Sequence, residues 1–134
     1  MNGKNKISEE VSKNFRHATL ALKYSFHGFV GCFKNEVAFR QEVILGVANL
    51  IAVLVIPLPL AVRLSMITLW VLLISVELLN SAIEAVVNIA SPEYHELAKR
   101  AKDYGSAAVF CILALFLGGW TSIAAYLIYE FLFT

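Results

Sequence analysis

The sequence predicts an all-α integral membrane protein, with three membrane-spanning helices that follow an amphipathic helix on the membrane surface. Of its 134 residues, 59% are hydrophobic and 16% are charged, whereas an ordinary soluble domain is about 45–50% apolar and about 25% charged. The charges are also unevenly distributed, because seven of the eleven Lys and Arg residues precede residue 43 and the stretch 43–90 contains three charged residues. This length fits one domain and leaves no room for a separate catalytic module.

The N-terminal part of the chain is polar and basic. We expect a flexible segment over residues 1–14. A surface helix is predicted over about 15–40, because large apolar residues recur on one helical face and basic residues on another. The apolar stripe comprises Phe15, Leu22, Phe26, Phe29 and Phe33, and the basic face comprises Arg16, Lys23, His27 and Lys34. A basic amphipathic helix of this kind typically lies in the headgroup plane of a bilayer.

Three apolar stretches are long enough to cross a bilayer, which takes about 20 helical residues. They are predicted at about 43–62, 64–90 and 104–129. Pro57 and Pro59 mark the end of the first span, because proline cannot donate to a helical hydrogen bond. Lys and Arg residues gather before the first span and in the segment 91–103. Both regions are therefore predicted to face the cytoplasm, with the C-terminus on the far side of the membrane.

A polar stripe runs along the second predicted span. Five residues, Glu77, Asn80, Ser81, Glu84 and Asn88, are spaced i, i+3, i+4, i+7 and i+11. They therefore share one helical face, with the two carboxylates about 10 Å apart along the axis. Amides and hydroxyls often bridge membrane helices, so packing explains those three as readily as function does. Two carboxylates at membrane depth, each costing at least about 2.5 kcal/mol, predict a functional site.

The segment 91–103 is the second dense cluster of charge. Ser91, Pro92 and Glu93 predict a helix start, with a hydroxyl cap, a proline at the first position and an acid in the first turn. Lys102 and Asp103, next to the third span, are expected to face inward. No second histidine follows at the spacing of a zinc-binding helix.

These residues suit phosphoryl transfer to a lipid alcohol. Oxygen ligands with open positions and nearby cations are what Mg²⁺ carrying nucleotide phosphates requires. Glu36 and Glu84 are therefore candidate metal ligands, and Lys102 is a candidate phosphate contact. Glu77 is placed to accept a proton from a hydroxyl. The sequence has no GxxxxGK[ST] and no GxGxxG motif, so residue chemistry alone leaves a kinase and a cation or proton pathway both open.

Three motifs resemble the bacterial membrane-integral diacylglycerol kinase family. They are NEVAFRQE at 35–42, ELLNSAIEAVVN at 77–88 and EYHELAKRAKDYGSAAV at 93–109, and the resemblance covers about residues 15–125. It implies a single kinase domain over 15–134 that uses ATP and Mg²⁺ to phosphorylate diacylglycerol to phosphatidic acid in the bacterial inner membrane. It also implies a homotrimer with sites shared between neighbouring subunits, and no nucleic-acid partner.

The resemblance further implies roles for individual residues. Glu77 is similar to the family's catalytic base, and Asn80 lies between the two spanning acids and orients them. Glu36 and Glu84 match its metal-binding carboxylates. The nucleotide-contacting positions match His17, Tyr24, Glu36, Glu84, Glu93, Tyr94, His95, Lys102 and Asp103. The positions near the lipid substrate match Ala38, Phe39, Arg40, Gln41, Glu42, Glu77 and Ser106.

The chain departs from the family pattern at two positions. His17 stands where an arginine is usual, with Arg16 beside it, so either side chain is a candidate for that role. Asn88 replaces a usual aspartate. The motif SPEYH is similar to the sister branch that phosphorylates undecaprenol, whereas NSAIE and RAKDYGSAAV look more like the diacylglycerol branch. The alternatives are an undecaprenol kinase, a small proton-coupled transporter that uses Glu77 and Glu84, and a structural subunit that tolerates loss of both.

Overall fold

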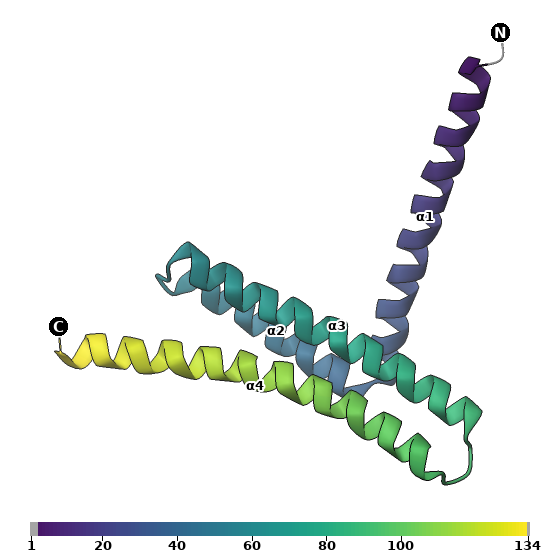
Figure 1. Cartoon of the computed structure of the whole chain (residues 1–134). Coiled ribbons are helices and arrows are strands. Elements are labelled where there is room, and N and C mark those ends of the chain that lie inside the picture. The colour runs from purple at the N-terminus through teal and green to yellow at the C-terminus, as the bar shows by residue number, and fades with distance from the viewer. Residues whose placement is uncertain (1–2, 134) are drawn as a thin grey trace. The chain divides into compact units, whose positions relative to one another are not determined.

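The structure is a computed structural model that describes residues 3–133, with side chains described for Glu10 and for residues 13–133. It consists of four helices over this range: α1 (Gly3–Asn35), α2 (Val37–Val55), α3 (Leu60–Ala90) and α4 (Glu96–Phe133) (Figure 1). The predicted all-α class is confirmed. The chain divides into two compact units, Met1–Asn35 and Glu36–Thr134, whereas the sequence predicts one domain over 15–134.

The first unit is α1. It begins at Gly3, within the segment 1–14 for which a flexible chain is expected, and Met1 and Asn2 lie outside the described residues. It ends at Asn35 rather than near residue 40, because Glu36 takes an extended backbone with φ −104° and ψ 123°. The apolar stripe of the prediction, Phe15, Leu22, Phe26, Phe29 and Phe33, is exposed on this helix.

The second unit contains three helices that are long and apolar enough to cross a membrane, which confirms the number of predicted spans. Their bounds differ from the prediction. The first span ends at Val55 instead of residue 62, because Ile56 precedes Pro57 and is extended. The third is part of a longer helix that begins at Glu96 instead of residue 104.

The short connection between α2 and α3 is held by one side chain. Arg63 donates from Nε to the Leu58 carbonyl at 2.8 Å and from Nη2 to the Ile56 carbonyl at 3.3 Å. The last carbonyls of a helix lack partners within the helix. Arg63 therefore satisfies the backbone where α2 has ended, which explains a basic residue between two apolar spans.

The core of this unit lies where α3 packs against both α2 and α4 (Figure 1). Val53, Met66 and Phe116 are buried there, one from each helix, and Trp70 and Trp120 pack against them. Elsewhere the apolar surface is open, since 6% of the most apolar stretch of α4 is buried. Such outward faces require a covering of lipid or of other chains.

Candidate active site

The polar stripe of α3 passes from a buried to an exposed end. Glu77 and Asn80 are 4% and 8% exposed, Ser81 and Glu84 are half-buried, and Asn88 is exposed. The stripe is expected to point into the bundle, and Glu77 and Asn80, its two buried residues, do so. Burial is greatest at Glu77, the acid that lies farthest from the α3–α4 connection.

Asn80 links the two carboxylates of α3. Its Nδ2 lies 3.4 Å from Oε1 of Glu84, and its side chain also hydrogen-bonds Glu77. Gly105 of α4 makes room for this amide, because a Cβ at that position would overlap the Asn80 Oδ1 atom. Asn80 Oδ1 itself is buried and has no hydrogen-bond partner. One acceptor atom of this amide therefore lies against Gly105 without a hydrogen-bond partner.

Three further carboxylates surround Glu77. Glu36 and Glu84 lie within charge–charge range of it, and so does Glu42. Carboxylates within charge–charge range of one another repel, and protons or a cation offset that repulsion.

Glu42 is a component of this region that sequence analysis does not single out as an acid of the site. It is 5% exposed, and its Oε2 has no hydrogen-bond partner. Its backbone carbonyl accepts a hydrogen bond of 3.0 Å from Nε1 of Trp70. The spacing of Glu42, Gly46, Asn49 and Val53 along one helical face gives the signal that it points inward, since all four are buried.

The other residues of the first motif have mixed exposure. Phe39 is buried, Glu36 and Arg40 are half-buried, and Ala38 and Gln41 are exposed, as is Ser106 on α4. In the described part of the chain, no group of three His, Cys, Asp or Glu side chains lies close enough to hold a metal ion. Glu36 and Glu84 therefore form at most a two-carboxylate site within one chain.

Charged residues at the start of α4 approach the exposed end of the stripe. Lys102 donates from Nζ to Oδ1 of Asn88 at 3.1 Å. It is half-buried and contacts α3, as expected for an inward-facing residue. Asp103 is exposed and pairs with Lys99 along the same helix at 3.0 Å, so its expected inward orientation is wrong.

The predicted helix start at Ser91 is also wrong, because α4 begins five residues later, at Glu96. Ser91 follows the end of α3, and its hydroxyl donates to the Glu93 carbonyl at 3.0 Å. His95 takes the capping role instead: its Nδ1 accepts from the Leu97 backbone N–H at 3.2 Å. A side-chain acceptor at this position satisfies a donor that the first turn leaves open.

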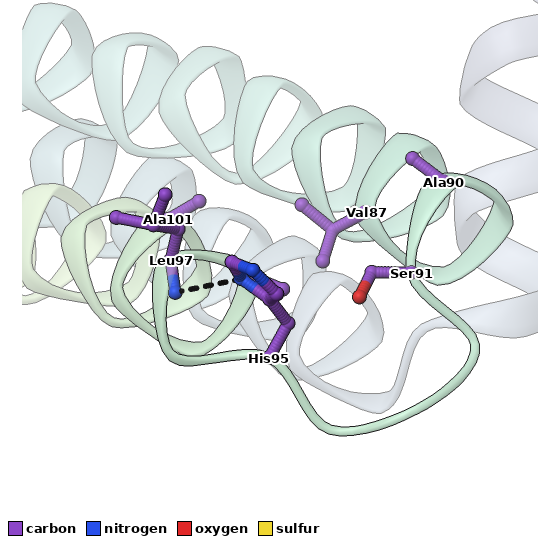
Figure 2. Close-up of a pocket in the computed structure, with 7 residues that line it drawn as sticks. Val87, Ala90, Ser91, His95, Leu97 and Ala101 are labelled. Carbon is purple, nitrogen blue, oxygen red and sulfur yellow. Dashed lines mark hydrogen bonds between the residues drawn. The ribbon is translucent and has the colours of Figure 1, made fainter.

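A pocket of about 390 Å³ lies where the end of α3 meets the start of α4. Figure 2 shows His95 and Ser91 at this pocket, with Val87 and Ala90 of α3 opposite Leu97 and Ala101 of α4. Glu93 and Tyr94 are exposed in the same connection, and the Tyr94 hydroxyl donates to Glu96 at 2.9 Å. His17 and Tyr24 belong to α1, where both are exposed.

Three helices that are long and apolar enough to cross a membrane, with the buried carboxylates Glu42 and Glu77 among them, are typical of a helical membrane protein. The sequence is similar to proteins of one family along most of its length. Residues 23–124 match the family described as prokaryotic diacylglycerol kinase. The chain therefore belongs to this family, and it is an enzyme of the lipid kinase class, as the motifs indicate.

Curated relatives agree with this assignment. A diacylglycerol kinase of Pseudomonas aeruginosa is 44% identical over 77% of this chain and 84% of its own length. One of Escherichia coli is 43% identical over 79% of this chain and 87% of its own length. One of Haemophilus influenzae is 42% identical over 77% of this chain and 90% of its own length.

Proposed function

We propose that the protein transfers the γ-phosphate of ATP directly to the primary hydroxyl of diacylglycerol, forming phosphatidic acid and ADP. Family membership supports the reaction, and it favours a kinase over a proton-coupled transporter or a structural subunit. The observation that carries the assignment of chemistry is the burial of Glu77 among Glu36, Glu42 and Glu84. A carboxylate is retained at membrane depth when it has a task there.

In this proposal Glu77 is the general base. Its carboxylate accepts the hydroxyl proton while the hydroxyl oxygen bonds to the γ-phosphorus and the bond from that phosphorus to the β,γ-bridging oxygen breaks, which releases ADP. Asn80 supports this role by a hydrogen bond to Glu77 that limits the orientations of the carboxylate. Phosphoryl transfer requires mainly positioning and charge stabilisation, so few residues suffice.

The donor set of this region fits Mg²⁺. Glu36 and Glu84 supply carboxylate oxygens, and Asn80 Oδ1 is a buried oxygen without a partner. Mg²⁺ prefers oxygen ligands and usually takes one or two carboxylates together with water and phosphate oxygens. We assign Glu36 and Glu84 as its ligands, and the ion would offset phosphate charge when bound.

The nucleotide is proposed to bind near the start of α4. Lys102 carries a positive charge beside the neutral side chain of Asn88, which leaves that charge available to phosphate oxygens. The pocket beside His95 and Ser91 offers apolar walls for a planar base (Figure 2). Glu93, Tyr94 and Asp103, with Tyr24 and either His17 or Arg16 of α1, complete the proposed contacts. Residues 38–42 and Ser106 are proposed to contact the lipid.

The proposed setting is the bacterial inner membrane. The N-terminus and the segment 91–103 would face the cytoplasm, where ATP is available, and the C-terminus would lie on the far side. The exposed apolar stripe of α1 supports a position on the membrane surface. The open apolar faces of α4 support a homotrimer, in which neighbouring subunits would complete each site.

A lipid phosphorylation assay tests the reaction. Purified protein in vesicles that contain either diacylglycerol or undecaprenol is supplied with radiolabelled ATP and Mg²⁺, and label in each lipid is measured. We expect label in phosphatidic acid that depends on Mg²⁺. Label confined to undecaprenyl phosphate would assign the sister activity, whereas no lipid label and no ADP would overturn the kinase assignment.

A further inference from the structure

Two hydrogen bonds from side chains to backbone carbonyls connect α2 and α3. Trp70 of α3 donates from Nε1 to the Glu42 carbonyl of α2 at 3.0 Å. In the opposite direction, Asn49 of α2 donates from Nδ2 to the Met66 carbonyl of α3 at 3.5 Å. Because each acceptor belongs to the backbone, each bond fixes the position of one helix along its axis relative to the other helix.

The indole ring of Trp70 also occupies a notch in α2. Gly46 lies one turn after Glu42 and is buried, and a Cβ at this position would overlap three ring atoms of Trp70. A side chain larger than hydrogen would therefore push the ring away. The contact at Gly46 and the hydrogen bond to Glu42 together fix the rotation of α2 about its axis and its position along that axis relative to α3.

This register decides where the Glu42 side chain points. Its carboxylate is buried, has an unpartnered Oε2 and lies within charge–charge range of Glu77. A slip of one residue moves a helix by about 1.5 Å along its axis and turns each side chain by about 100°. Such a slip would turn Glu42 away from α3, so the arrangement of the carboxylates depends on the register of α2.

We infer that Trp70 is a positioning residue of the kinase, which holds α2 in the register that keeps Glu42 facing Glu77. It acts through the backbone of α2 at Glu42 and through the notch at Gly46, without touching the reacting atoms. The inference deepens the proposed function and rests on it, because turnover is one of its measurements.

The substitution Trp70→Phe tests the contact of Trp70 with α2. An aromatic ring is retained, whereas the N–H and part of the indole that lies against Gly46 are lost, so we expect kcat to fall about tenfold, as for a small displacement of reacting groups. The KM for ATP should change less than kcat does, because Lys102, the proposed phosphate contact, lies on α4 outside this interface, whereas Glu36 is the one proposed metal ligand next to α2. Unchanged kcat in purified Trp70→Phe protein would overturn the inference.

Trp120→Phe is the matched control. It also removes an indole N–H hydrogen bond, because Trp120 of α4 donates from Nε1 to the side-chain Oδ1 of Asn49 at 3.1 Å. It leaves the bonds from Trp70 and Asn49 to backbone carbonyls in place. We expect a lower unfolding temperature in both variants and a kcat within about twofold of wild type in this one. An equal loss of kcat in the two variants would mean that Trp70 only stabilises the fold.

A double-mutant cycle tests the notch. Gly46→Ala should lower kcat more than Trp70→Phe does, because its methyl group displaces the indole ring. In the Trp70→Phe background the smaller ring leaves space for the methyl, so Gly46→Ala should have a smaller effect there. Strictly multiplicative effects of the two substitutions would contradict the proposed contact.

The indole N–H signals give a measurement that does not use activity. The chain has two tryptophans, so ¹⁵N-indole spectra of Trp70→Phe and Trp120→Phe assign both signals. We expect the Trp70 N–H to resist deuterium exchange in wild type and to lose protection in Gly46→Ala. Rapid exchange in wild type would overturn the inference that Trp70 holds α2 in register. A protected indole in a protein without lipid kinase activity would overturn the proposed function instead.

Discussion

Asn49 and Asn80 are both buried amides within the same three-helix unit, yet their hydrogen bonding differs. Asn49 is 2% exposed and uses both ends of its amide, since it donates to the Met66 carbonyl and accepts from Trp120. Asn80 is 8% exposed and interacts with Glu77 and Glu84, but its Oδ1 has no partner. Buried polar groups are normally satisfied, so the unpartnered oxygen of Asn80 is unusual.

This contrast separates the two halves of the bundle. Around Asn49 the polar atoms of α2, α3 and α4 bond to one another, and we call this hydrogen-bonded set the frame. Around Asn80 four carboxylates gather and two buried oxygens, Glu42 Oε2 and Asn80 Oδ1, are left open. Partly satisfied polar clusters are costly to keep in a membrane. The second half is therefore the proposed active site, and the first half is the frame that holds it.

The largest expected effect is at Glu77. Glu77→Gln should lower turnover by about 10²–10⁴-fold, because the general base is lost, and should leave Mg-ATP affinity nearly intact. Glu84→Gln should weaken nucleotide and metal binding as well, because it removes a proposed ligand. Turnover and nucleotide titration on both variants measure this difference. Wild-type turnover in Glu77→Gln would show that the base assignment is wrong.

The two amides allow the contrast to be tested directly. Asn80→Ala should lower turnover about 10–100-fold with little change in unfolding, since it removes an orienting bond to the base. Asn49→Ala should lower the free energy of unfolding by about 1–2 kcal/mol, because it leaves both the Met66 carbonyl and the indole N–H of Trp120 without their partner. It should lower turnover less than Asn80→Ala does, because Trp70 still bonds to α2. Thermal unfolding and turnover are compared for both. The reverse pattern would refute the separation into frame and site.

Two glycines of α4, Gly105 and Gly118, provide a second test of the contrast between site and frame, with a smaller expected effect on turnover. Gly105→Ala would place a Cβ against Asn80 Oδ1 and should lower turnover roughly fivefold, through displacement of that amide. Gly118 has no other atom near the position of its Cβ. Gly118→Ala should therefore be neutral or stabilise by about 0.5–1 kcal/mol, through helix propensity. Equal loss of turnover in both variants would argue against a special role of Gly105.

The smallest expected effect is at the exposed end of the stripe. Asn88→Ala removes the acceptor of Lys102 and should raise the KM for ATP about two- to fivefold, the value of one solvent-exposed hydrogen bond. Its kcat should stay close to wild type, because Asn88 is remote from the base. Steady-state kinetics with varied ATP separate the two constants, and a selective loss of kcat would contradict this assignment.

The spans and the stripe could be predicted from sequence because they depend on local periodicity and composition. Charge is scarce between residues 43 and 90, so Glu77 and Glu84 stand out, and their spacing with Asn80 indicates one face. Helix ends were predicted less well. Ser91 and Pro92 resemble a helix start, yet His95 provides the acceptor for the first turn of α4, a choice that depends on how the connection folds.

The frame could not be predicted, because its contacts join residues far apart in the chain. Trp70 bonds to a carbonyl 28 residues away, and Trp120 bonds to Asn49 across 71 residues. Nothing local in the sequence distinguishes Gly46, which matters because the indole ring of Trp70 occupies the space of a Cβ at this position. The inward acid Glu42 has a local signal, the buried face of α2, but its neighbour Glu77 is identified only by tertiary structure.

The unequal lengths of the spans have a consequence for the host bilayer. α2 has 19 residues, about 28 Å at 1.5 Å per residue, close to the roughly 30 Å of hydrocarbon in a typical bilayer. α4 has 38 residues, about 57 Å, so it extends well beyond the hydrocarbon. Because Trp70 and Asn49 tie α2 to α3, α2 has little freedom to tilt alone when thickness changes. Hydrophobic mismatch is then taken up by the surrounding lipid, and turnover is expected to vary with the acyl-chain length of the vesicles.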